Sequence, residues 1–141
     1  MTSRTSGRVT RCTPADARAR LRKAQSFVTG AELVLELGED TDLDLPAVAA
    51  ALSVLAGIAA ADAACCSALG ERSRGQDHRQ AELLVATVLP HGAQMARDLK
   101  RLLERKDNAH YGAIGTTERE ARDMLGWAKR LAGDAQRVLD R

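Results

Sequence analysis

Between Ala47 and Leu69 the chain is dominated by alanine and carries a single charge, Asp62. A helix of this composition is apolar on most of its circumference, so it needs other elements around it. The chain has only one Phe, one Tyr and one Trp, and alanine, leucine and valine must therefore build the core. These residues favour closely packed helices over a β-sandwich. The sequence predicts an all-α fold in which residues 44–69 form the central helix.

A first helix is predicted near the N-terminus. Thr13 is a suitable N-cap, Pro14 fits the first helical position, and Asp16 is an acidic third residue. Apolar residues then follow at alternating steps of four and three, which marks one face of a helix: Ala17, Leu21, Ala24, Val28, Ala31 and Leu35. We interpret residues 1–12 as a flexible leader and residues 13–141 as a single helical domain.

Three more helices are predicted in the C-terminal half. Asp77, with a glutamine three residues later, is a plausible capping residue for a short helix that Pro90 ends or kinks. The next helix gives way to a loop over residues 108–115, and Thr117 with Glu120 forms a capping box for the last one. The predicted fold is an up-and-down four-helix bundle with one additional short or kinked helix. The expected inward residues are Ala81, Leu84, Val85 and Val88, then Met95, Ala96, Leu99, Leu102 and Leu103, then Ala121, Met124, Leu125, Ala128, Leu131, Ala135 and Val138.

Charge is balanced overall but unevenly distributed. The net charge of +2 excludes a strongly basic histone-like protein and an acidic disordered tail. Residues 1–30 hold seven basic side chains and one acidic one, whereas residues 31–69 hold seven acidic side chains and no basic one. Intramolecular pairing between these blocks is the favoured interpretation, ahead of a docking surface for a polyanion.

The cysteines and the apolar segment indicate a compartment. The basic, Ser/Thr-rich start has no apolar stretch behind it, so we expect no secretory signal. The alanine-rich segment fits a buried helix better than a membrane span. Of three cysteines, Cys65 and Cys66 are neighbours that suit core filling, and no disulfide framework or Cys-x-x-Cys metal site is predicted. We expect a reduced, cytoplasmic protein.

The segment that can carry chemistry is the end of the penultimate long helix, where Arg105 and His110 are separated by four residues. We expect the helix to end between them, so that both side chains reach one cleft. A guanidinium can hold a phosphate, and an imidazole can move a proton near neutral pH. Together they suit metal-independent RNA cleavage, in which a base deprotonates the 2′-OH and a cation stabilises the charge on phosphorus. On spacing alone, a helix cap and a loop histidine are the favoured explanation of the pair, because Arg-x4-His occurs by chance in many chains.

An all-α chain with Arg-x4-His at this place resembles the HEPN superfamily. Its hallmark is an arginine, usually a polar residue, and a histidine four to six positions on, which residues 105–110 match with the sequence RKDNAH. The surroundings of the histidine, AHYG, and the layout of residues 14–140 also resemble small actinobacterial HEPN proteins.

The resemblance implies an RNA-binding protein or endoribonuclease that acts as a homodimer, often in toxin–antitoxin or defence systems with a cognate antitoxin. Arg105 would bind the scissile phosphate, and His110 would act as general base or acid. The sequence departs from the family at Lys106, where active members more often carry Asn, Asp or His. Asp107 or Asn108 would then supply the polar function, with Tyr111 in a supporting place. No cofactor or metal is implied.

Asp62 is the remaining candidate, because a buried carboxylate needs a partner. A structural arginine or hydroxyl is preferred as that partner over Arg105 or His110. A zinc site built from the three histidines (His78, His91 and His110) matches no ligand spacing. The alternative function is a non-catalytic helical interaction protein whose Arg/His turn is structural. A metal-dependent bundle enzyme would need Glu-x-x-His pairs, and the sequence has none.

Overall fold

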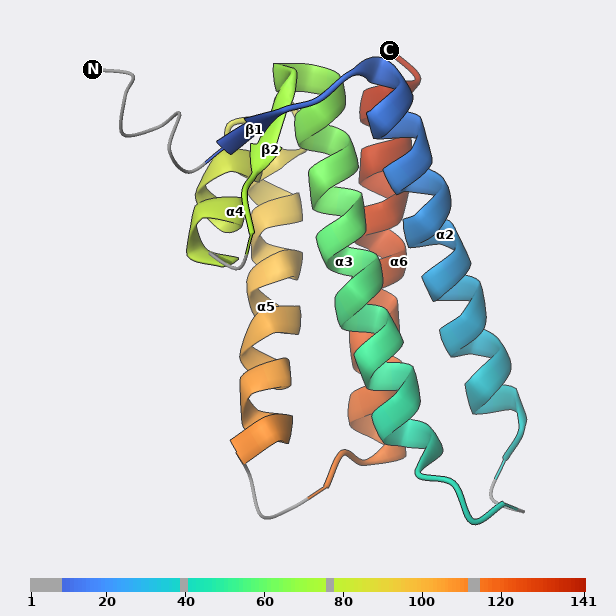
Figure 1. Cartoon of the computed structure of the whole chain (residues 1–141). Coiled ribbons are helices and arrows are strands. Elements are labelled where there is room, and N and C mark those ends of the chain that lie inside the picture. Colours follow the sequence, from blue (N-terminus) through green and yellow to red (C-terminus); the bar gives the residue numbers. More distant parts are fainter. Residues whose placement is uncertain (1–8, 39–40, 76–77, 112–114) are drawn as a thin grey trace.

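The computed structural model of the chain describes residues 9–38, 41–75, 78–111 and 115–141, without the side chains of residues 107–111. Five helices and two short strands are found in this part of the chain: β1 (Val9–Arg11), α2 (Pro14–Glu36), α3 (Leu45–Leu69), β2 (Glu71–Ser73), α4 (His78–Val85), α5 (Gly92–Tyr111) and α6 (Glu118–Leu139). Figure 1 shows the four long helices side by side, with the short α4 next to one end of α5. The prediction of a mostly helical fold is confirmed.

The start of α2 follows directly from its sequence. Thr13 Oγ1 accepts a hydrogen bond from the backbone N–H of Asp16 at 3.1 Å, and the Asp16 carboxylate accepts one from the backbone N–H of Thr13 at 2.8 Å. This capping box precedes Pro14 at the first helical position. All six residues of the predicted apolar face of α2 are buried.

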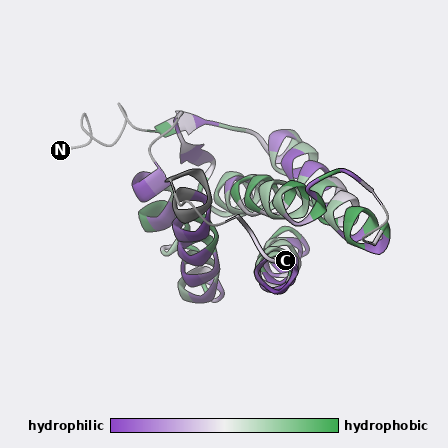
Figure 2. Ribbon diagram, turned by 90° about the horizontal axis from the view of Figure 1, so that it is seen from below, coloured by the Kyte–Doolittle hydropathy of each residue, from purple (hydrophilic) through white to green (hydrophobic). Residues whose placement is uncertain are grey.

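Helix α3 lies at the centre of the fold. It contacts α2, α5 and α6, and Figure 2 shows it hydrophobic around most of its circumference. At Gly57 a β-carbon would lie 2.5 Å from Leu102 Cδ1, so glycine lets α5 pack closely against α3. Among the described residues α3 is the one helix long and apolar enough to cross a membrane, and 67% of its most apolar window is buried inside the molecule. Its role as the core helix accounts for that composition.

The C-terminal half follows the prediction except at two helix ends, the first of which is α4, where the helix ends at Val85 and not at Pro90. Thr117 and Glu120 form the expected capping box, and all seven predicted core residues of α6 are buried. Helix α5, however, continues to Tyr111, so the prediction of a loop from residue 108 is wrong. Asn108 and its polar neighbours resemble a turn, but no proline interrupts the helix before Gly112.

The N-terminal segment differs from the prediction in two ways. Val9–Arg11, expected in the flexible leader, form β1, which pairs antiparallel with β2 so that Val9 lies opposite Ser73. Cys12 and Cys66 form a disulfide, whereas none was predicted. The strands are too short for a visible alternation of apolar and polar residues, and the two cysteines are 54 positions apart in sequence. Only the folded chain brings Cys12 to the C-terminal end of α3.

Candidate functional site

Arg105 lies in the last third of α5 and faces the first turn of α6. Its Nη1 is 3.4 Å from Glu120 Oε2, and the two side chains are 44% and 38% exposed. The other carboxylate oxygen of Glu120 accepts a hydrogen bond from the Thr117 hydroxyl at 3.1 Å. Glu120 therefore serves two purposes, because it caps α6 and also neutralises Arg105. Sequence reasoning identified the cap but missed the ion pair with Arg105.

The other residues of the motif lie outside the described side chains. These are Asp107, Asn108, His110 and Tyr111, whose backbone belongs to α5. The expectation that the helix ends between positions 105 and 110 is wrong, since α5 continues past both. On a continuous α-helix, five residues correspond to about 140° around the axis. The backbone alone therefore does not bring these two positions to one face of α5.

An apolar cavity of 410 Å³ lies between the N-terminal part of α3 and this end of α5. Val54, Leu55 and Ile58 of α3 line it, together with Met124 of α6 and Lys106 of α5. An apolar surface next to a cationic side chain can accommodate a flat or aliphatic group that carries a negative charge. Lys106, which the motif left unexplained, thus borders a cavity.

Asp62 belongs to the C-terminal part of α3 and Arg105 to the C-terminal part of α5, and Figure 1 shows these two helix ends at opposite ends of the molecule. Its partner is Arg20 of α2, whose Nη1 is 3.9 Å from Asp62 Oδ2. Burial raises the pKa of Asp62 from 3.8 to about 6, although the charges of Arg20 and Arg72 oppose this shift. The preferred interpretation, a structural arginine, is therefore the one observed. Within the described part of the chain, Arg20 Nε is also buried without a hydrogen-bond partner.

The described histidines do not share a site. His78 is the first residue of α4, and His91 Nδ1 is 3.8 Å from Asp134 Oδ1. In the described ranges, no three His, Cys, Asp or Glu side chains lie close enough together to hold a metal ion.

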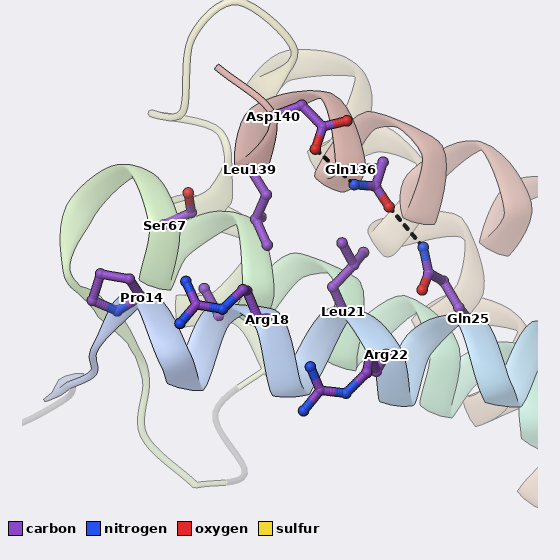
Figure 3. A pocket seen from close by; sticks show the side chains of 10 residues that line it. Pro14, Arg18, Leu21, Arg22, Gln25, Ser67, Gln136, Leu139 and Asp140 are labelled. Carbon is purple, nitrogen blue, oxygen red and sulfur yellow. Dashed lines mark hydrogen bonds between the residues drawn. The ribbon is translucent and has the colours of Figure 1, made fainter.

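A second cavity, of 330 Å³, lies between α2 and the C-terminal end of α6 (Figure 3). The Gln25 side-chain amide donates to Gln136 Oε1 at 2.8 Å, which bridges the two helices. Arg18 and Arg22 of α2 also line the cavity. Sequence reasoning missed it because its two sides are more than 100 residues apart in the chain.

Comparisons of the chain with protein-family models, with curated proteins and with solved structures give no match. The functional argument therefore depends on the residues and geometry of this chain.

Proposed function

We propose that this protein binds RNA as an HEPN-type homodimer and cleaves it without a metal ion. The position of Arg105 carries the proposal. Its guanidinium is 44% exposed and is paired with a carboxylate that is itself 38% exposed. Ion pairs of this kind contribute little to stability, so a phosphate can take the place of Glu120. Lys106 beside the apolar cavity supports the same function, because a nucleotide combines a phosphate with a flat base.

The helical arrangement is compatible with the HEPN proposal. In Figure 1 the chain runs along α2, α3, α5 and α6 in alternating directions, as in an up-and-down four-helix bundle with α4 as an additional short helix. Because positions 105 and 110 lie on different sides of a continuous α5, the proposal requires two copies of the chain. Arg105 of one copy and His110 of the other then form one cleft, in which arginine holds the phosphate and histidine moves the proton.

A mixed single-stranded RNA pool with a chelator present tests the proposal. Wild type should cleave it, and Arg105→Ala and His110→Ala should each reduce cleavage at least a hundredfold, since each removes one catalytic group. Arg122→Ala is the matched control, because Arg122 is a comparably exposed arginine paired with a carboxylate on α6. Equal inactivity of wild type and both variants would exclude the ribonuclease.

Glu120→Gln tests whether the carboxylate competes with phosphate for Arg105. Glutamine is also favoured at this position of a capping box, so the start of α6 is retained while the negative charge is removed. We expect RNA affinity to rise several-fold at low salt. An unchanged affinity would count against a role for Arg105 in phosphate binding.

A second candidate is the non-catalytic interaction protein, and the Arg105–Glu120 pair favours it specifically. In that case the pair only fixes the α5–α6 connection. Arg105→Ala would then lower stability slightly and leave any RNA binding unchanged, which is the opposite of the expectation above.

A further inference from the structure

In two ion pairs of the outer seam between α5 and α6, the carboxylate is buried and the arginine reaches solvent. Asp98 of α5 is completely buried, and Asp134 of α6 is 6% exposed. The arginines that they hold, Arg130 and Arg137, have side chains that are 47% and 64% exposed. The arginines of these two pairs therefore reach solvent while their carboxylate partners do not, although the side chains of Glu120 and Asp123 on α6 are themselves 38% and 49% exposed.

The arginine of the central pair is held in a fixed plane. Arg130 Nε donates to Asp98 Oδ2 at 2.9 Å and its Nη2 donates to Asp98 Oδ1 at 2.7 Å. A guanidinium has five N–H donors, so this side-on bidentate contact leaves three for a ligand. Because the group is already oriented, less conformational entropy is lost when it binds a phosphate.

An aromatic ring also lies in the seam between α5 and α6. The Arg101 guanidinium carbon is 5.8 Å from the centre of the Trp127 ring, and its Nη1 is 3.8 Å from Asp98 Oδ1. Rings and flat guanidinium groups are the surfaces on which unpaired bases stack. This is the only Trp in the chain. Stacking of this kind distinguishes a nucleic acid from an acidic peptide, which offers charge without flat bases.

At one end of the seam these residues reach Arg105 of the proposed active site. Arg105, Arg101 and Asp98 follow one another at steps of four and three, so they share one face of α5. Opposite them on α6 lie Glu120, Trp127 and Arg130. From position 94 to position 105 this face extends about 16 Å along the helix axis. Arg97, which hydrogen-bonds Gln94 at 2.9 Å, adds a further exposed cation beside it.

We propose that the α5–α6 seam, formed by Arg97, Arg101, Trp127, Arg130 and Arg137, is a binding track for single-stranded RNA that leads to Arg105. The proposal rests on the proposed RNA-binding function and adds the strand form of the substrate and its path. Guanidinium groups contact successive phosphates, and a base stacks on the Arg101 guanidinium, which itself lies over the partly buried Trp127 ring. The buried carboxylates of Asp98 and Asp134 hold Arg101, Arg130 and Arg137, and the Gln94 side chain holds Arg97.

The test measures binding of a fluorescent single-stranded RNA 20-mer of mixed sequence over a salt series. The seam variant is Arg97→Ala/Arg101→Ala, which leaves the bidentate Asp98–Arg130 pair in place. The control is Arg119→Ala/Arg122→Ala, which removes two exposed arginines with carboxylate partners on α6. We expect the seam variant to weaken binding at least tenfold and to flatten the salt dependence by about 1.4 in log–log slope, which corresponds to two phosphate contacts. The control should weaken binding less than twofold.

A third variant, Arg101→Lys, keeps the charge but removes the flat group, and we expect it to weaken binding measurably while leaving the salt slope unchanged. Equal losses in the seam and control variants would overturn the track, and so would equal competition by a duplex RNA or by polyglutamate.

The two proposals fail in different ways. If wild type binds RNA and responds to Arg105→Ala but not to the seam variant, the track is wrong and the proposed function stands. If binding depends on the seam but the wild type cleaves nothing, the track stands and the ribonuclease is wrong. Absence of RNA binding by wild type would overturn both.

Discussion

Asp62 and Asp98 are both carboxylates packed between helices, but their surroundings differ. Asp98 accepts two hydrogen bonds from Arg130, at 2.7 and 2.9 Å, and a third from Gln94 at 3.2 Å. Asp62 has one arginine, Arg20, at 3.9 Å, and burial raises its pKa to about 6. The comparison shows that the number and geometry of hydrogen bonds, more than the presence of an opposite charge, decide whether a buried carboxylate is well compensated.

The arginine partners of Asp98 and Asp62 also differ in how well they are hydrogen-bonded. Hydrogen bonding to Asp98 raises the pKa of the Arg130 guanidinium. Arg20, by contrast, has a buried Nε with no hydrogen-bond partner among the described residues. The pair between α5 and α6 is thus well suited to fix a surface, whereas the pair between α2 and α3 is a weak point of the core.

The largest change in stability is expected when Arg130 is replaced. Arg130→Met keeps an apolar stem but leaves the Asp98 carboxylate buried with only Gln94 and the more distant Arg101, and we expect a loss of about 3–5 kcal/mol in the free energy of unfolding. Chemical denaturation measures it. Asp98→Leu/Arg130→Met, which removes both charges, should recover most of the loss. If Arg130→Met lowered the free energy of unfolding by less than about 1 kcal/mol, Asp98 would depend on its arginine no more than Asp62 does. That result would contradict the contrast between the two carboxylates.

The next largest change is expected when Asp62 is replaced, and here the substitution should raise the stability of the protein. The unfolded chain loses this proton near pH 3.8, while the folded protein keeps it to about pH 6. The folded state is therefore progressively penalised as the pH rises from about 4 to 6, and the penalty is constant above that. Asp62→Asn removes it, so the variant should be more stable than wild type by up to about 3 kcal/mol at pH 7.5 and equally stable at pH 4.

Denaturation at the two pH values checks this expectation. The same substitution at Asp98 is the control, and it should lower stability at pH 7.5, because an amide nitrogen cannot accept the hydrogen bonds of Arg130. If Asp62→Asn changed stability equally at pH 4 and pH 7.5, the titration of Asp62 would not be the cause.

These contacts also show what the sequence could predict. Helix starts were predicted well because capping is local: Thr13 and Thr117 each bind a residue three positions on. The buried faces of α2 and α6 were predicted because a period of 3.6 appears within one segment. The Asp98–Arg130 pair, 32 residues apart, leaves no such local pattern, and neither do the Cys12–Cys66 disulfide and the β1–β2 pairing.

The candidate site was predictable to the same extent. The Arg-x4-His spacing together with the family resemblance singled out Arg105, and the capping pattern singled out Glu120, but nothing local indicated that the two form an ion pair. The arginines of the α5–α6 seam were not singled out at all, because the contacts that hold Arg101, Arg130 and Arg137 involve carboxylates whose burial the sequence does not show. The end of α5, where no proline follows, was also predicted wrongly.

The smallest change in stability is expected for a substitution that removes the charge of Arg20 but keeps its packing. Arg20→Met retains the stem that packs between α2 and α3, so the lost ion pair should cost about 1 kcal/mol at pH 7.5. At pH 4 Asp62 is largely neutral, and the same substitution should then cost almost nothing. In the Asp62→Asn background the cost should be near zero at both pH values, since no carboxylate remains. A double-mutant cycle at the two pH values measures this coupling. If the coupling between Arg20 and Asp62 persisted at pH 4, Arg20 would act through its packing. The two ion pairs would then differ in how their side chains pack, and not in how well the carboxylate charge is compensated.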